Sequence, residues 1–232
     1  MREIVFDTET TGLNPAGGDR IVEIGCVEIY NRVETGRHYH AYFNPEREMP
    51  FEAEMVHGLS TIFLSDKPLF SHKAAELLEF IEDSPLVAHN ASFDFGFLNH
   101  ELERCGRPIV PMSRMVDTLT LARSKHPGAK HSLDALCMRF GIDRSHRVKH
   151  GALLDAQLLA QVYVELTGGR QIGLGLVADA GMVAVDQSAQ PVTTREPRRA
   201  RPHAAADEEL ERHRAFIARL VNPLWERFAS LH

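Results

Sequence analysis

The chain has 232 residues, of which 44% are hydrophobic and 25% charged, and its formal net charge is −6. These values are typical of one globular core with a short extension, and they argue against a protein that holds nucleic acid by a broadly basic surface. No apolar run reaches the length of a membrane span, so we expect no membrane association. The cysteines, Cys26, Cys105 and Cys137, lack metal-ligand spacing, which indicates free thiols in a reducing cytoplasm.

The first part of the chain predicts three strands. An apolar run covers residues 2–7, an alternating pattern covers 21–30, and a third strand is expected near 36–43. The connection at residues 14–19 is too short for a crossover helix. These strands should therefore form an antiparallel meander.

Helices and short strands are expected after the meander. The helices cover 71–83, a segment from near Ser92, and segments near 117–125, 132–140 and 151–167, with short strands at 86–88 and around 114–117. This mixture predicts one α/β domain with a mixed sheet flanked by helices, ending near residues 168–169.

The composition changes beyond that point. Residues 178–206 are rich in Ala, Pro, Arg and Gln without apolar periodicity, which predicts a flexible linker. Three acids at 207–209 then begin an expected terminal amphipathic helix, interrupted at Pro223. Its apolar stripe comprises Leu210, Ile217, Val221, Leu224 and Phe228. We therefore expect a domain of residues 1–170, a linker of 171–206 and a helical tail of 207–232.

Two acids, Asp7 and Glu9, stand at the end of the first predicted strand. Because successive side chains on a strand point to opposite faces, these two project together while Thr8 points away. Neighbouring carboxylates repel each other and are costly to bury unless a cation neutralises them. The two acids predict a metal site. If no other acids were close, a solvated strand end would explain them.

A third acid, Asp94, lies in the first turn of the helix that follows the strand ending at Ala88, and Asn90 or Ser92 is expected to cap that helix. Taken alone, Asp94 also fits a charge that merely favours a helix N-terminus. The prediction that Asp94 is a metal ligand therefore depends on the other acidic clusters.

A fourth acid, Asp155, lies in the first turns of the helix near 151–167, and His150 precedes it by five residues. With Gly151 between them, we place His150 on the preceding loop, where it leans over the site that Asp155 helps to build. A lone loop histidine is usually just solvated. Beside a metal cluster it is a candidate base, because imidazole titrates near neutral pH.

In this order and spacing, the clusters resemble the three motifs of the DEDD 3′→5′ exonucleases, in the subtype with a catalytic histidine. The match covers roughly residues 2–168, and two further segments, 56–59 and 132–143, resemble the proofreading ε subunits of bacterial DNA polymerase III. The resemblance implies a ribonuclease H-like fold and hydrolysis of DNA 3′ ends to nucleoside 5′-monophosphates, for proofreading during replication.

The resemblance also implies roles for the clustered residues. Asp7, Glu9 and Asp155 would hold one divalent cation, Mg²⁺ or Mn²⁺. Asp7 would bridge to a second cation that Asp94 helps to hold, and His150 would take the proton from the attacking water. Independently of the family, hard carboxylate oxygens suit these two ions.

Substrate contacts follow from the same resemblance. Glu52 and His57 would contact the terminal nucleotide, and the backbone around Thr8 would approach its sugar. The implied substrate-binding set is Asp7, Thr8, Glu9, Glu52, His57 and Asp155. Alternatively, Glu52 is only a helix-start charge and His57 a polar loop residue.

Two segments beyond the domain suggest partners. Gln171, Leu174 and Leu176 resemble the short peptide by which bacterial proteins bind the β sliding clamp, and an ordinary domain-exit segment is the alternative. In the ε family the tail holds the exonuclease to the polymerase III α subunit. The expected contacts here are Ile217, Val221, Leu224, Trp225 and Phe228. A tail that folds back on its own domain is the competing interpretation.

The family places such a protein in the bacterial cytoplasm at the nucleoid-associated replisome, and it allows a small accessory subunit. Two alternative functions are open. The motifs specify phosphodiester hydrolysis and not the sugar, so an RNA-processing exonuclease of the same superfamily is the nearer one. A non-catalytic nucleic-acid interaction module is the other, and the five intact catalytic positions argue against it.

Overall fold

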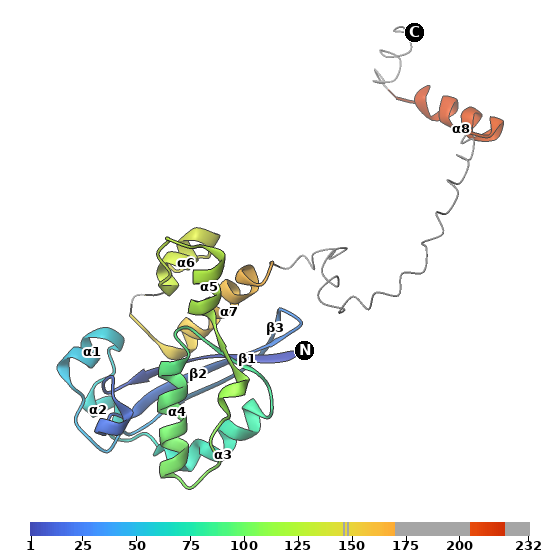
Figure 1. Ribbon diagram of the computed structural model, residues 1–232. Helices are drawn as coiled ribbons and strands as arrows, with labels where there is room; N and C mark the ends of the chain where they lie inside the picture. The colour runs from blue at the N-terminus through green and yellow to red at the C-terminus, as the bar shows by residue number, and fades with distance from the viewer. Residues whose placement is uncertain (146, 148, 170–204, 221–232) are drawn as a thin grey trace, which may run out of the picture. The chain divides into compact units, whose positions relative to one another are not determined.

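The computed structural model describes residues 1–145, 147, 149–169 and 205–220. The chain divides into two units, Met1–Ala178 and Asp179–His232. In the first unit a five-stranded sheet is flanked by helices (Figure 1), as the sequence predicted. Among the described helices, none is long and apolar enough to cross a bilayer.

The strand order of the sheet is β3-β2-β1-β4-β5. Its strands are β1 (Arg2–Thr10), β2 (Ile21–Tyr30), β3 (Val33–Tyr42), β4 (Leu86–Ala88) and β5 (Met115–Asp117). The first three strands pair antiparallel, whereas β4 and β5 continue the sheet in parallel with β1. The predicted meander and mixed sheet are both confirmed.

Strand β1 is longer than its apolar run. The prediction ended at residue 7, but Thr8 and Glu9 pair with Ile24 and Glu23 of β2, and the strand ends at Thr10. The hydrogen bonds to β2 thus extend the strand through polar residues that apolar patterning does not detect. As a result, both acids of the first cluster belong to a paired strand.

Five helices were predicted, four of them within about two residues at both ends and α4 at its start alone. These are α3 (Phe70–Ile81), α4 (Ser92–Arg104), α5 (Thr118–Lys125), α6 (Leu133–Phe140) and α7 (Ala152–Leu166). Two short helices, α1 (Phe51–His57) and α2 (Thr61–Leu64), and two 3-10 turns, η1 (Pro15–Gly17) and η2 (Met112–Arg114), were not predicted. Helix α1 escaped detection because it fully buries only His57 and exposes Phe51 and Met55.

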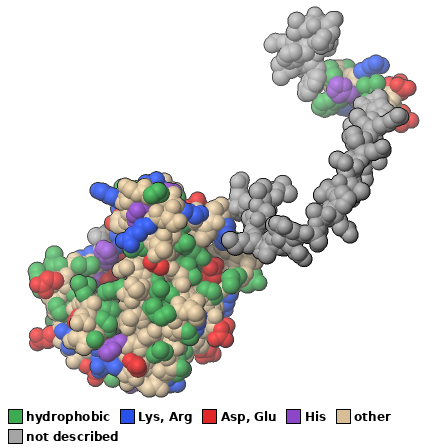
Figure 2. Space-filling view, in the orientation of Figure 1, with side chains coloured by type: hydrophobic (Ala, Val, Ile, Leu, Met, Phe, Trp, Pro, Cys, Tyr) green, Lys and Arg blue, Asp and Glu red, His purple; other side chains and the backbone are tan. Residues whose placement is uncertain are grey.

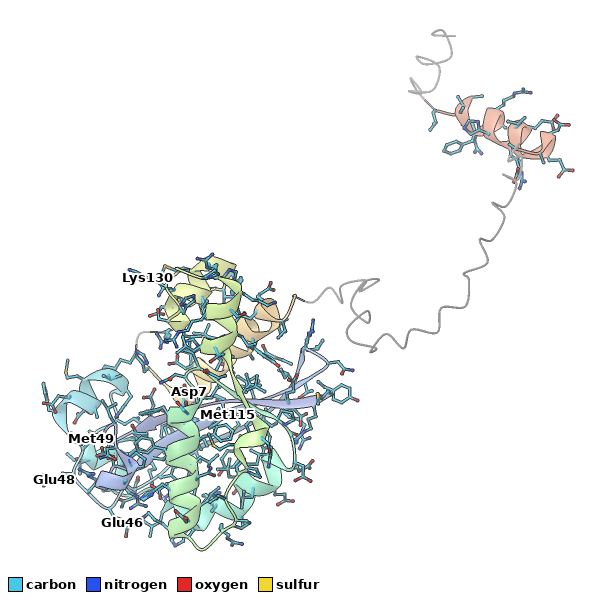
Figure 3. All side chains as sticks on the ribbon, viewed as in Figure 1. Asp7, Glu46, Glu48, Met49, Met115 and Lys130 are labelled. Atoms are coloured by element: carbon cyan, nitrogen blue, oxygen red, sulfur yellow. The ribbon has the colours of Figure 1, made fainter. Side chains whose placement is uncertain are left out.

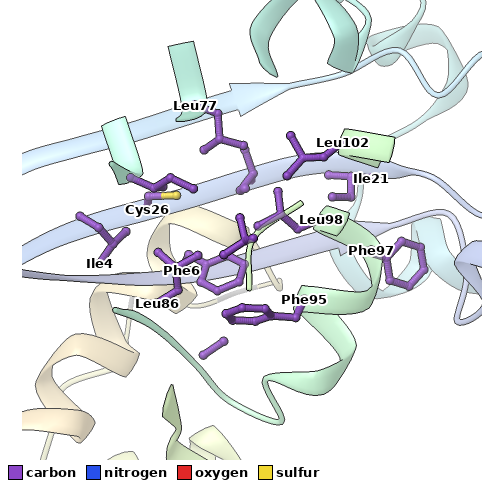
Figure 4. Close-up of a cluster of buried hydrophobic side chains, with 14 of the residues drawn as sticks. Ile4, Phe6, Ile21, Cys26, Leu77, Leu86, Phe95, Phe97, Leu98 and Leu102 are labelled. Atoms are coloured by element: carbon purple, nitrogen blue, oxygen red, sulfur yellow. The ribbon is translucent and has the colours of Figure 1, made fainter. Parts of the chain in front are cut away.

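The core lies on both faces of the sheet. Ile4 and Phe6 point to the side that α3 and α4 cover, where Phe6 packs edge-on against Phe95 (Figure 4). Val5 points to the other side and packs in a cluster with Ala156 and other residues of α7. Alternation along β1 thus directs side chains toward two different helical layers.

Helix α7 lies very close to the sheet at Gly25. A Cβ added to Gly25 would lie 2.3 Å from both N and Cα of Leu153, in the first turn of α7. Gly25 is also the β2 residue paired with Asp7. The missing side chain therefore lets the start of α7 approach the strand that carries Asp7.

The second unit contains α8 (Asp207–Ile217), whose first turn holds Asp207, Glu208 and Glu209, as predicted. Ile217 is its last residue. The remaining predicted tail contacts, Val221, Leu224, Trp225 and Phe228, and the predicted clamp peptide with Gln171, Leu174 and Leu176, lie outside the described residues.

Candidate active site

The four predicted carboxylates line one pocket of about 260 Å³. Asp7 and Glu9 come from β1, Asp94 from α4 and Asp155 from α7, so segments far apart in the chain meet here. Figure 3 shows Asp7 beside the N-terminal end of α4. Three of the acids are nearly inaccessible, with 8% of Glu9 and 3% each of Asp94 and Asp155 exposed.

The short length of β4 brings Asp94 to β1. Strand β4 pairs with β1 at Ile4 and Val5, so the rest of β1 extends past the end of β4. The first turn of α4 reaches that edge, where the Thr8 hydroxyl donates to Oδ1 of Asp94 at 2.7 Å. Thr8 thus points away from Asp7 and Glu9, as alternation predicts, and fixes the third acid.

The start of α4 lacks the side-chain cap that the sequence predicted. Ala91 occupies the N-cap position and no side chain of this segment caps the helix, so the expectation of Asn90 or Ser92 was wrong. Instead, Oδ1 of Asp117 at the end of β5 accepts from the backbone N–H of Asn90 at 3.0 Å and of Ala91 at 3.3 Å. Asp117 thus fixes the turn before α4 without capping the helix, because neither N–H belongs to its first turn.

Glu9, His150 and Asp155 each place a ligand atom within 4.8 Å of the others. His150 lies on the loop before α7, with its Nδ1 3.4 Å from Oδ2 of Asp155 and its side chain 49% exposed. The histidine therefore stands at the solvent side of the carboxylate cluster.

The electrostatics of the pocket favour a cation. Burial, reinforced by the charges of Asp94 and Glu9, raises the pKa of Asp7 well above its usual value. Burial, together with the Glu23 carboxylate, raises the pKa of Glu9 to about 8. Burial also raises the pKa of Asp94 to about 7, against the hydrogen bond from Thr8. Crowded oxygen ligands that resist ionisation are neutralised by divalent cations, so the donor set fits such ions.

Sequence reasoning missed Arg147, which donates from Nε and Nη2 to the two carboxylate oxygens of Asp155 at 2.5 and 2.7 Å. Its Nη1 lies 3.0 Å from Oδ1 of Asp134. No periodicity marks a loop arginine, so the only signal in the sequence was its place three residues before His150.

Glu52 and His57 line a second pocket of about 430 Å³, which shares Thr8, Glu9 and Phe93 with the first. Glu52 lies exposed in the first turn of α1. His57 is the last residue of α1 and only 6% exposed, so the alternative of a polar loop residue was wrong. Its Nδ1 accepts from the N–H of Leu59 at 3.0 Å, and burial lowers its pKa.

Residues 4–163 match the exonuclease family RNase_T. The chain belongs to this exonuclease family. The exonuclease is 50% identical over 224 residues to the DNA polymerase III subunit epsilon of Rickettsia conorii, across 95% of this chain and 97% of that protein. It is 42% identical over 222 residues to the subunit of the same name from Escherichia coli K12, across 92% and 91% of the two chains.

Among solved structures, exonuclease X in complex with 5′-overhanging duplex DNA has a TM-score of 0.55 and 25% identity, across 71% of this chain and 90% of that one. The resemblance indicated by the three motifs is thereby confirmed. The chain is a 3′→5′ exonuclease with the ribonuclease H-like mixed sheet of its family, and enzymes of this type use divalent metal ions.

Proposed function

We propose that this exonuclease is the proofreading subunit of a bacterial DNA polymerase III holoenzyme and removes nucleotides from DNA 3′ ends as 5′-monophosphates. The observation that carries the proposal is the meeting of four acids and His150 around one pocket. The near full-length similarity to epsilon subunits from two bacteria supports the replicative role.

We assign the metal ligands as the family resemblance implies. Asp7, Glu9 and Asp155 would hold one cation, and Asp7 and Asp94 a second. Either Mg²⁺ or Mn²⁺ suits these oxygen donors, and a bound pair would activate water and stabilise the leaving 3′-oxygen. The half-exposed imidazole of His150, at the solvent side of the cluster, would take the proton from that water.

The second pocket would bind the terminal nucleotide. Its wall carries apolar side chains, Leu13, Val56 and Phe93, suited to a base, together with Glu52 and His57 as polar contacts. Thr8 and Glu9 line both pockets, which would bring the terminal sugar next to the proposed metal ligands. A nucleotide held in the second pocket would thus present its phosphate to the first.

Delivery by the polymerase would compensate for weak intrinsic affinity. The net charge is −6, although Lys and Arg side chains gather over α5 and α6 on the face shown in Figure 2. We propose that residues 207–232 bind the α subunit, that 171–206 act as a tether, and that Gln171, Leu174 and Leu176 contact the β clamp. A tether raises the effective concentration of DNA ends at the domain. This assignment places the enzyme in the cytoplasm, at the replisome, with or without a small accessory subunit.

Digestion of end-labelled oligonucleotides at single-nucleotide resolution tests the proposal. DNA and RNA strands with paired or mispaired 3′ ends are incubated with Mg²⁺ or Mn²⁺. Stepwise 3′→5′ loss of deoxynucleotides, faster from mispaired ends, is the expected result. Preferential trimming of RNA would instead assign the enzyme to RNA processing, and no cleavage with either ion would reject the catalytic assignment.

A further inference from the structure

Arg147 occupies both oxygens of a proposed metal ligand. Its guanidinium donates to Oδ1 and Oδ2 of Asp155 at 2.5 and 2.7 Å. The side chain of Arg147 is 8% exposed and that of Asp155 4%, so water screens this bidentate pair weakly. A divalent cation held by Asp155 needs at least one of the same oxygens.

The same guanidinium also contacts the proposed base. Its Nη2 lies 2.9 Å from Nδ1 of His150, and the hydrogen bond to Asp155 raises the pKa of Arg147 above its already high value. Arg147 is therefore charged at every working pH and would repel a metal ion bound beside it. Asp134, whose side chain is 44% exposed, already accepts from Nη1 and offers the arginine a partner away from Asp155.

We propose that Arg147 is an internal counter-ion that competes with the divalent cation for Asp155. It neutralises the buried carboxylate before the cation binds, and it moves toward Asp134 when the cation takes its place. Because Arg147 also touches His150, cation binding releases the base from the guanidinium in the same step. This inference rests on the proposed metal site and adds a residue that controls its occupancy.

Calorimetric titration of Mn²⁺ into the full-length, metal-stripped protein tests the competition. Arg147→Gln should bind Mn²⁺ about tenfold more tightly than the wild type, because the cation no longer displaces a charge-assisted pair. Arg144→Gln is the matched control, because this substitution removes the same charge from the same loop. Arg144 pairs with Asp134 of α6 at 2.9 Å rather than with Asp155. Its affinity should change less than about twofold.

The thermal unfolding temperature gives a second readout of the same variants. Without metal, Arg147→Gln should unfold at a lower temperature than the wild type, because Asp155 loses its partner. With saturating Mn²⁺ the variant should gain more stability than the wild type does. An arginine that merely supports Asp155 would produce equal losses in both conditions, and unchanged or weaker Mn²⁺ binding in Arg147→Gln would overturn the inference. Absence of binding in both the wild type and the variant would reject the metal site itself.

A measurement on the wild type covers the case in which Arg147→Gln does not fold. In a nitrogen-15 NMR spectrum of arginine Nε–H groups, saturating Mg²⁺ should shift the Arg147 signal and speed its exchange with water. The Nε–H of Arg20, which donates to Glu101 at 2.6 Å in a buried pair outside the pocket, should not change. An unaltered Arg147 signal at saturation would contradict the displacement.

Discussion

The two sides of the carboxylate pocket are held in different ways. On one side, Asp7, Asp94 and Asp155 project from β1, α4 and α7, and the core packs these elements together. On the other side, Arg147 and His150 lie on the loop between α6 and α7, where the side chain of His150 is 49% exposed.

We expect this difference to separate the effects of the carboxylates from those of His150. Strand pairing and helix packing fix the positions of the carboxylates. A change that moves those elements therefore also moves the proposed metal ligands. The loop groups touch the ligands without belonging to the core. Variants on the carboxylate side should therefore affect metal binding and stability together, whereas variants of His150 should affect the rate alone.

The largest effect is expected from Asp7→Ala, since Asp7 serves both proposed cation positions. The rate of cleavage of single-stranded DNA in Mg²⁺ should fall at least about 10³-fold, with an unchanged circular dichroism spectrum. Asp66→Ala removes an exposed acid paired with Lys67 outside the pocket and should leave the rate unchanged. Near-normal turnover by folded Asp7→Ala would exclude the metal assignment.

His150→Ala tests whether the histidine on the loop before α7 acts as the general base. Loss of a general base should lower the rate of DNA cleavage by about 10²–10⁴-fold. Because the side chain is half exposed, the unfolding temperature should stay near that of the wild type. His72→Ala, at an exposed position of α3, is the control. A variant that cleaves DNA at the wild-type rate would show that His150 does not act as the base.

Gly25→Ala tests whether packing sets the ligand geometry. The added Cβ would lie 2.3 Å from backbone atoms of Leu153, which forces the start of α7, and with it Asp155, away from Asp7. We expect about 10²-fold slower cleavage and a loss of about 1–3 kcal/mol in the free energy of unfolding.

Gly96→Ala is the control for that variant, because a Cβ on this residue of α4 meets nothing within 4 Å. Its stability should stay the same or rise by up to about 1 kcal/mol, since alanine favours helix. Equal behaviour of the two alanine variants in urea unfolding and in cleavage would contradict the role of Gly25.

Glu9→Gln should stabilise the protein in EDTA at alkaline pH. The folded state raises the pKa of Glu9 from 4.5 to about 8, so it favours the protonated carboxyl, and the wild type loses stability as the pH rises through that window. The neutral amide avoids this loss and should add about 2 kcal/mol to the free energy of unfolding near pH 8.5, and nothing near pH 4. Urea unfolding at both pH values measures this difference in the free energy of unfolding. Glu79→Gln, at an exposed site on α3, is the control. A variant less stable than wild type at pH 8.5 would refute the charge crowding.

The smallest effect on catalysis is expected from deletion of residues 207–232. Cleavage of free oligonucleotides should remain within about twofold of the full-length rate, because the deletion removes none of the pocket residues. Binding to the polymerase α subunit, measured by surface plasmon resonance, should be lost. Retained binding would show that the tail is not the attachment.

Periodicity predicted the parts of the site that lie on regular elements. Alternation placed Asp7 and Glu9 on one face of β1, and helix-start patterns placed Asp94 and Asp155 in first turns, where the structure has them. These predictions depend only on neighbours in sequence. The end of β1 was misplaced because it depends on hydrogen bonds to another strand.

Tertiary contacts account for what the sequence did not predict. The ion pair of Arg147 with Asp155, and the hydrogen bond from the turn before α4 to Asp117, join segments that are distant in sequence and leave no periodic signature. Gly25 carried a signal, since a glycine within an alternating strand indicates a close approach. The pattern does not say which element approaches, and the structure identifies it as α7.

Anomalous diffraction from crystals of the protein grown with Mn²⁺ and a nucleoside 5′-monophosphate tests the account most directly. The account predicts one manganese peak among Asp7, Glu9 and Asp155 and a second between Asp7 and Asp94, with Arg147 turned away from Asp155. Manganese bound elsewhere, or a pocket without a peak at saturating Mn²⁺, would contradict it.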